Sequence, residues 1–361
     1  LVGRTVPGRT SLPILECILF KAEEGVGITL YASDTEMCIN TAPIPADIEV
    51  SGAVALNARL FTDIIRKMPG DYVQLETDEK LMTLCKSGQA KLEISGLPAD
   101  EFPLVDEEEL VGAKDNYVLK SQTLKDMIRQ TIFSVSIDPS KVILTGELLE
   151  IVDNSLRVVA VDMFRISYRE VDLPEGTNDA SVVVPAKALN ELSRAISGDN
   201  EEEISFYFTD KRAFFQTDQF TMSARLLEGE FIRYNQIFNQ DFSSSMVINR
   251  TQMLNSLERS VLVAMENRQI SITLDIRDDL LVITSRSDKG HTYDEIACET
   301  DGTDMTIYFN PRYLLDALRA IEDESVIIKF NTPRSPCTIQ SVTDATQTKY
   351  KYLIVPLRSP N

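Results

Sequence analysis

The chain has 361 residues, of which 43% are hydrophobic and 25% charged, as in an ordinary globular protein of about two or three domains. It contains no run of about 18 apolar residues and no apolar stretch near its start, so we expect neither a membrane-spanning helix nor a secretory signal. The formal charge of −20 disfavours nucleic acid as a partner, unless the basic residues are gathered on one surface.

Cysteine and histidine are too scattered to indicate a metal centre or a disulfide framework. The five cysteines form no C-x-x-C pair, and we expect them to be reduced thiols in a cytoplasmic protein. The single histidine, His291, lies in the polar segment 288–292, which predicts an exposed turn. We therefore expect no metal and no cofactor.

One helical pattern occurs three times along the chain. Its copies span residues 57–66, 185–194 and 310–319, each with Asn or Pro at its start and apolar residues at helical spacing. Successive copies begin 128 and 125 residues apart. Each copy carries two basic residues seven positions apart: Arg59 with Arg66, Lys187 with Arg194, and Arg312 with Arg319.

A second helix is predicted ahead of the first one in the later two repeats. It begins at Ser121 in one and at Thr251 in the other, and superposing the two pairs Arg129 with Arg259. In the first repeat this helix should begin just before Leu1. We therefore expect the first domain to lack an opening strand and part of its first helix.

Alternating apolar and polar residues predict antiparallel strands after each repeated helix. These segments are 72–76 and 91–94, then 204–208 and 220–224, and finally 326–330 and 350–354. The predicted fold is α+β, with three domains of two helices and about eight short strands. Their predicted boundaries are 1–112, 113–240 and 241–361, with acidic clusters at 106–109 and 201–203 in loops.

The basic residues of each repeated helix share one face. Residues seven apart lie two helical turns from one another, and the apolar residues occupy the other side of the helix. The basic side chains therefore point away from the core, and three domains side by side would join them into one surface. Such a surface suits contacts with phosphates that do not depend on base sequence.

Five segments resemble the bacterial β sliding clamp, the β subunit of DNA polymerase III. They are residues 8–15, 32–37, 96–103, 159–166 and 352–358, and the resemblance covers essentially the whole chain. It implies the DNA clamp fold, in which the three domains form half of a ring and two chains pair head to tail as a homodimer. It also implies a non-enzymatic processivity factor that encircles double-stranded DNA.

The resemblance implies several partners and two kinds of site. The partners are the catalytic subunit of the polymerase, the clamp loader, and repair proteins that carry short clamp-binding motifs. Arg9, Lys141 and Lys187 are implied to face DNA. With the repeated helices, the predicted DNA-facing set is Arg9, Arg59, Arg66, Lys141, Lys187, Arg194, Arg259, Arg312 and Arg319. The implied peptide pocket comprises Leu144, Thr145, Val161, Met163, Phe164, Arg165, Ile166, Ile232, Ile237, Pro336, Leu353, Val355, Pro356 and Leu357.

The chain departs from the family pattern at several of these places. Met163 and Phe164 stand where a Gly-His pair is more usual, and Ile232 stands where proline is common. Glu230 and Gln236 stand near positions where basic residues occur. The first change alters the shape of the pocket and the motif that it prefers, and the last two weaken DNA contact in that loop.

Two other functions compete with this interpretation. Asp34, Glu36 or Asp162 could serve a carboxylate-dependent hydrolase, but no histidine or glycine-rich phosphate loop stands near them in the sequence. An acidic protein-interaction scaffold would need no DNA contact, and the recurring basic pairs argue against it.

Overall fold

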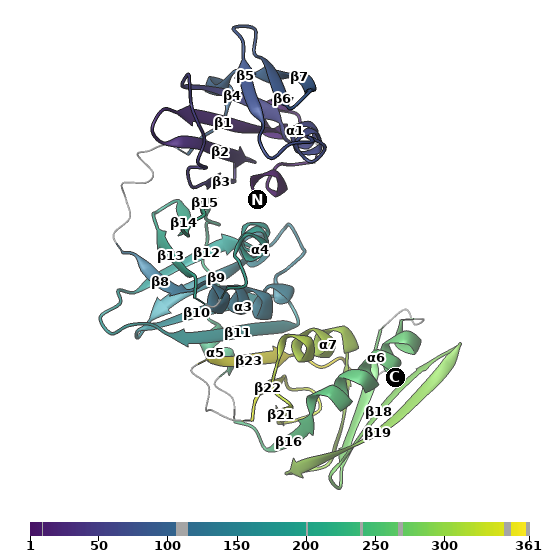
Figure 1. Ribbon diagram of the computed structural model, residues 1–361. Coiled ribbons are helices and arrows are strands. Elements are labelled where there is room, and N and C mark those ends of the chain that lie inside the picture. Colours follow the sequence, from purple (N-terminus) through teal and green to yellow (C-terminus); the bar gives the residue numbers. More distant parts are fainter. Residues whose placement is uncertain are drawn as a thin grey trace. The chain divides into compact units, whose positions relative to one another are not determined.

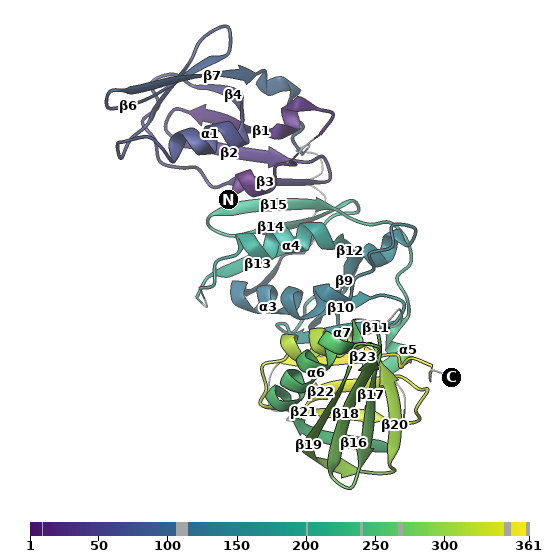
Figure 2. The ribbon, with the colours of Figure 1, turned by 90° about the vertical axis from the view of Figure 1, so that its right-hand side faces the viewer.

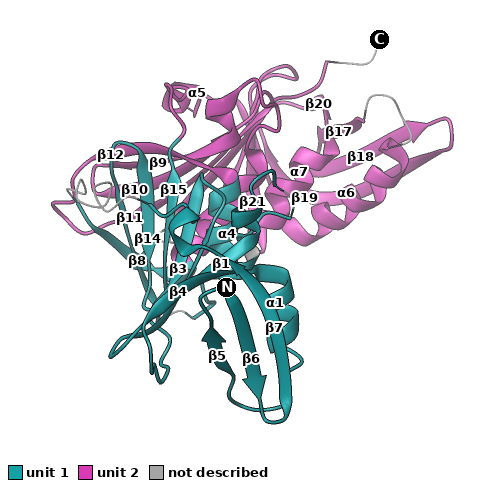
Figure 3. Ribbon diagram, turned by 90° about the horizontal axis from the view of Figure 1, so that it is seen from above, with its two compact units in different colours: residues 1–122, 187–226 teal, residues 123–186, 227–361 magenta. Residues whose placement is uncertain are grey.

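The structure is a computed structural model that describes residues 1–8, 10–105, 115–199, 201–238, 241–265, 270–342 and 348–358. It divides into two compact units, residues 1–122 with 187–226 and residues 123–186 with 227–361 (Figure 3). No helix in these ranges is long and apolar enough to cross a membrane.

Unit 1 combines the N-terminal strands with a later group of strands from the middle of the chain. Its elements are η1 (Val2–Arg4), η2 (Pro13–Glu16), β1 (Cys17–Glu23), β2 (Gly27–Ser33), β3 (Met37–Thr41), β4 (Gly52–Asn57), α1 (Ala58–Ile65), β5 (Gln74–Thr77), β6 (Met82–Ser87), β7 (Ala90–Leu97), η3 (Ala99–Glu101), β8 (Tyr117–Lys120), α4 (Ala186–Ala195, from Lys187 on), β13 (Glu203–Phe208), β14 (Arg212–Gln216) and β15 (Phe220–Arg225). The strands of unit 1 form one sheet in the order β5-β6-β7-β4-β1-β2-β3-β15-β14-β13-β8, and every described pairing in it is antiparallel.

Unit 2 combines the other strands of the middle region with the C-terminal part of the chain (Figures 1 and 2). Its elements are most of α3 (Ser121–Thr131), η4 (Ile132–Ser134), η5 (Val142–Thr145), β9 (Gly146–Val152), β10 (Ser155–Val161), β11 (Arg165–Asp172), β12 (Ala180–Pro185), α5 (Tyr234–Phe238), β16 (Ser244–Asn249), α6 (Arg250–Ala264), β17 (Ile272–Arg277), β18 (Leu280–Ser287), β19 (Gly290–Asp301), β20 (Met305–Phe309), α7 (Pro311–Ala320), β21 (Ser325–Phe330), β22 (Cys337–Ser341) and β23 (Thr348–Ile354). The strand order is β12-β9-β10-β11-β23-β22-β21-β16-β19-β18-β17-β20.

The repeated helices form where their caps and apolar faces predict them. The side chain of Asn57 accepts a hydrogen bond from the Leu60 amide at the start of α1, and Asn310 accepts one from Arg312 at the start of α7. In α7 the buried face includes Leu314 and Leu318. Helices α6 and α7 lie side by side and cover one core of unit 2 (Figures 1 and 2).

The predicted α+β class and antiparallel strands are confirmed, and two local predictions need correction. His291 is exposed but lies in strand β19, opposite Arg286, because the hairpin turn is only two residues long. Glu203 opens strand β13, so only the first two residues of the cluster 201–203 lie in the connection. The cluster 106–109 and the predicted boundaries at 112 and 240 lie outside the described residues.

One buried carboxyl group breaks the likeness among the three repeats. Leu56, Val184 and Phe309 each directly precede one of the three repeated segments. In the neighbouring strand, Ile18 lies opposite Leu56, Glu147 opposite Val184, and Ile272 opposite Phe309. Glu147 is fully buried, and neither of its carboxyl oxygens has a hydrogen-bond partner among the described residues. Burial raises the pKa of Glu147 to about 8, and the nearby Thr131 hydroxyl offsets this only in part.

We predict that Glu147 makes the protein less stable as pH rises. Its folded-state pKa of about 8 lies above the unfolded value of about 4.3, so between these values the folded state holds a proton that the unfolded state has lost. The free energy of unfolding should fall by about 1.4 kcal/mol per pH unit in that window from this group. Urea denaturation between pH 5 and 8 should show that Glu147→Gln removes this slope.

Glu147→Ile, which restores the residue of the other two repeats, should have the same effect. The exposed Glu175→Gln should leave the pH dependence as in the wild-type protein. Equal slopes for Glu147→Gln and the wild type would contradict the assignment.

Candidate functional site

An apolar cluster lies where strand β11 pairs with strand β23 in unit 2. Ile166 stands opposite Leu353 in this pairing, and both side chains are buried. Seven residues of the implied pocket belong to the cluster: Leu144, Val161, Ile166, Ile232, Ile237, Leu353 and Val355. The structure therefore brings half of the implied pocket residues together, from four separate parts of the chain.

The segment that carries Ile232 and Ile237 is anchored by a tyrosine. Tyr234 is buried, and its hydroxyl donates a hydrogen bond to Glu150 of strand β9. Burial first, and then the hydrogen bond to Glu150, raise the pKa of Tyr234. The ring also packs 5.9 Å from that of Tyr168 in β11. This one side chain fixes the short helix α5 on the sheet, and with it the two isoleucines.

The exposed rim of the cluster is formed by the turn before β11. Met163 and Phe164 are 61% and 48% exposed, although both are apolar. The ring of Phe164 stacks on that of Tyr313 of α7, with centroids 6.0 Å apart. The amide of Val355 donates to the Phe164 carbonyl oxygen at 2.8 Å, which joins this turn to the end of β23. Exposed apolar side chains beside an apolar cluster are typical of a binding surface.

Seven of the implied pocket residues lie outside the apolar cluster: Met163 and Phe164 of the rim, Arg165, and the four residues Thr145, Pro336, Pro356 and Leu357. The Thr145 hydroxyl donates to the Val142 carbonyl, and the Leu357 amide donates to the Tyr308 carbonyl at 2.7 Å. Pro336 and Pro356 are half-buried. The Leu357 contact keeps the segment after β23 beside β20, within reach of the rim.

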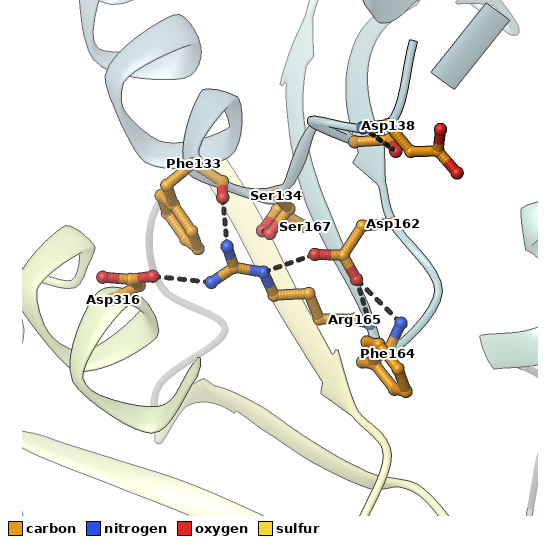
Figure 4. Close-up of polar contacts among 9 residues, drawn as sticks. Phe133, Ser134, Asp138, Asp162, Phe164, Arg165, Ser167 and Asp316 are labelled. Atoms are coloured by element: carbon orange, nitrogen blue, oxygen red, sulfur yellow. Dashed lines mark hydrogen bonds and ion pairs between the residues drawn. The ribbon is translucent and has the colours of Figure 1, made fainter. Parts of the chain in front are cut away.

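Arg165 is held between the turn and helix α7 rather than exposed to solvent (Figure 4). Its Nε donates to Asp162 at 3.0 Å, and Nη1 donates to Asp316 at 2.6 Å. Nη2 donates to the Phe133 carbonyl oxygen, and the guanidinium group lies over the rings of Phe133 and Tyr313. The Arg165 side chain is only 12% exposed. We therefore assign Arg165 a structural role: its side chain links strand β11 to η4 and α7.

Most of the predicted DNA-facing residues are exposed, and several have acidic neighbours. Arg59, Arg66 and Arg312 are exposed and form no ion pair among the described residues. The paired residues are Lys187 with Asp34, Arg194 with Glu191, Arg259 with Asp294, and Arg319 with Glu258. Lys141 is half-buried and its ammonium group contacts the Met163 sulfur, beside the apolar rim. Arg9 lies outside the described residues.

The sequence interpretation missed an acidic residue that recurs on each repeated helix. Asp63, Glu191 and Asp316 each stand four residues after the first basic residue of their helix. Glu191 binds Arg194 at 2.7 Å, and Asp316 binds Arg165. This recurrence was present in the alignment of the repeats, and it reduces the net positive charge of each helix face. Tyr313, Phe133 and Tyr234 carried no comparable sequence signal.

The carboxylates considered for catalysis have structural contacts. Asp34 accepts from the amides of Glu36 and Met37, and Asp162 accepts from those of Phe164 and Arg165. Both residues therefore form tight turns before strands. Within the described ranges, no group of three or more His, Cys, Asp or Glu residues could hold a metal ion.

Known proteins match this chain along essentially its whole length. Family models of the DNA polymerase III β subunit match residues 1–106 (N-terminal domain), 118–232 (central domain) and 235–358 (C-terminal domain). β sliding clamps of Staphylococcus epidermidis and Staphylococcus aureus are each 33% identical to it, over 99% of this chain and 95% of the relative.

Solved structures agree with these relatives. A putative DNA polymerase III β subunit from Eubacterium rectale has a TM-score of 0.93 and 36% identity, over 99% of this chain and 95% of that chain. The DNA polymerase sliding clamp of Bacillus subtilis has a TM-score of 0.92 and 29% identity, with the same coverage.

We predict that Arg165 is the main polar support of this site. Arg165→Ala leaves Asp162 and Asp316, whose side chains are 16% and 34% exposed, without their shared partner. The free energy of unfolding should fall by about 2–4 kcal/mol. Arg319→Ala removes the ion pair between Arg319 of α7 and Glu258 of α6, whose side chains are 55% and 45% exposed, and should cost less than about 1 kcal/mol. Urea denaturation of the two variants tests this, and equal losses would contradict it.

Proposed function

Because the chain belongs to the DNA polymerase III β subunit family and is a DNA sliding clamp, we propose that it closes around duplex DNA and holds the polymerase on its template. The observation that carries this proposal is the match of all three family domains in order along one chain. We place the domain boundaries at 1–112, 113–240 and 241–361. In this proposal the chain has no active site of its own, and polymerase activity belongs to the partner that it binds in the cytoplasm.

The proposed DNA track is the exposed face of the three repeated helices. Arg59 and Arg66 of the first helix and Arg312 of the third are the cations best placed to take up phosphates, because no acidic side chain pairs with them in the part of the chain that the structure describes. Lys187 and Arg319 are exposed but must leave an acidic partner first. A track of a few weak, interchangeable contacts retains DNA without fixing its register, which suits sliding.

We propose that two chains pair head to tail into a closed ring. Among the described pairings, residues 90–95 of β7 bond only to β6, and residues 290–297 of β19 bond only to β18. Each edge therefore offers unpaired backbone groups in a different unit of the chain. Exposed apolar residues stand on or near them: Leu92 on β7, Tyr293 on β19 and Leu262 on α6. Two unlike surfaces on one chain suit a heterologous interface that closes a ring.

We propose that the apolar cluster with its exposed rim is the docking groove for short motifs of the polymerase, the clamp loader and repair proteins. Its floor is the fixed cluster that includes Leu144, Ile166 and Leu353, and Phe164 forms its rim. The floor is ordered by β-sheet pairing, so a peptide would not have to arrange it on binding. Apolar anchors in such a groove carry most of the binding energy.

We predict that retention on DNA is topological and salt-sensitive. After loading, circular duplex should keep the protein, whereas linear duplex should lose it from its ends. Changing Arg59, Lys187 and Arg312 together to Glu should reduce loading. The slope of the logarithm of the DNA-binding constant against the logarithm of the salt concentration should become shallower by about two to three. Gel filtration of protein on circular and linearised plasmid measures this, and light scattering should give the mass of a dimer for every variant.

A matched control changes exposed basic residues outside the repeated helices: Lys80→Glu, Lys211→Glu and Arg334→Glu together. The change in net charge is the same, but loading should stay close to that of the wild type. Equal retention on linear and circular DNA would contradict encirclement, and so would a strong preference for one sequence.

We predict that Phe164→Ala weakens peptide docking without affecting the ring. Loss of a large apolar anchor should cost about 2 kcal/mol, or about thirtyfold in the Kd of a short polymerase-derived peptide. Tyr72→Ala, which removes an aromatic side chain that is 88% exposed, should leave the Kd unchanged. Fluorescence titration of the labelled peptide measures both. If the peptide binds Phe164→Ala and the wild type equally, the groove is wrongly placed.

A further inference from the structure

The chain contains two junctions of the same construction, and only one of them carries the apolar groove. At the first, the turn at Asp34 leads into β3, which pairs with β15. At the second, the turn at Asp162 leads into β11, which pairs with β23. The two aspartates are 128 residues apart, as are the first two repeated helices.

The backbone contacts of the two junctions match one by one. The Asp34 amide donates a hydrogen bond to the Met37 carbonyl oxygen at 3.0 Å. In the same way, the Asp162 amide donates to the Arg165 carbonyl oxygen at 3.1 Å. The Arg225 amide donates to the Glu36 carbonyl at 2.8 Å. At the second junction Val355 donates to Phe164 at the same distance. Glu36 is therefore the counterpart of Phe164, and Arg225 is the counterpart of Val355.

The apolar clusters beside the two junctions differ in what the incoming strand contributes to them. The cluster in unit 2 extends across the strand pairing and includes Leu353 and Val355 of the incoming chain. Its counterpart in unit 1 includes Ile14, Leu15 and Leu19 but, in the described chain, takes no residue from β15. Leu353 and Val355 are replaced there by Ser223 and Arg225. The first junction therefore has the fold of the groove without its apolar wall.

We propose that Glu36 and Arg225 keep peptides out of the first junction, so that each chain offers one docking groove rather than two. This rests on the proposed function of the second junction as the groove. The two side chains form an ion pair at 4.0 Å and are 62% and 59% exposed. A peptide that placed apolar anchors on this surface would have to remove water from both charges and gain no apolar contact. At the second junction the two equivalent positions are held by Phe164 and Val355, which are apolar and offer such contact.

The test converts the first junction toward the second and counts bound peptides. Isothermal titration of the dimer with the polymerase-derived peptide should give one peptide per chain for the wild type. Glu36→Phe with Arg225→Val should give two, and the new site should be about tenfold or more weaker because Ser223 still lacks an apolar side chain. Adding Phe164→Ala to this variant should weaken the original site about thirtyfold and leave the new one unchanged.

The matched control exchanges the charges, Glu36→Arg with Arg225→Glu, and should still give one peptide per chain. A second peptide on this control or on the wild type would overturn the proposal. So would a folded, dimeric Glu36→Phe/Arg225→Val variant that binds only one. Absence of any peptide binding by the wild type would instead overturn the groove itself, and the inference with it.

Discussion

Antiparallel pairing between strands that are distant in sequence is the interaction on which the rest of the structure depends. The pairing of β3 with β15 joins the N-terminal strands to the middle region, and that of β11 with β23 joins the middle region to the C-terminal strands. Each sheet therefore continues past a family-domain limit. The backbone hydrogen bonds of the second pairing, which end with the Val355 amide on the Phe164 carbonyl, fix these two residues beside each other. The proposed groove depends on this continuity, because its two walls come from the two sides of one pairing.

The charge of the protein becomes consistent with DNA binding once it is resolved by position. The chain carries a net charge of −20, yet each repeated helix exposes two basic residues on one face. Each helix also carries an acidic residue four positions after its first basic residue, which lowers the net positive charge of that face, and in the second helix Glu191 pairs with Arg194. Weak local attraction inside an acidic protein opposes tight static binding. A clamp that must move along DNA needs this combination.

Much of the fold could be predicted from the sequence, because its signals are local and repeated. Helix caps such as Asn57 and Asn310, and the spacing of the basic residues, identified the repeated helices to within about a residue. The hairpin before His291 was placed less well, since the two-residue turn leaves no room for a longer polar loop. The residues of the proposed groove, which come from the second and third repeats, were predicted from the family resemblance rather than from local signals.

The role of Arg165 could not be predicted in this way. Its partners Asp316 and Phe133 are brought to it only by the tertiary structure, and an exposed arginine and a buried one look alike in sequence.

Disagreements among the repeats indicate where function has altered a shared structure. Three copies of one fold face the same packing problem, and where they use similar residues, as at the apolar faces of α1 and α7, stability explains the choice. Where they differ at an equivalent backbone position, packing alone cannot be the reason. Phe164 against Glu36 distinguishes the exposed apolar rim of the proposed groove from a charged surface. At the position after these two, the second junction has Arg165, which forms an ion pair with Asp316 of α7, whereas the first junction has Met37, which is buried. The groove is thus defined less by its fold, which occurs twice, than by the few side chains that the second copy does not share with the first.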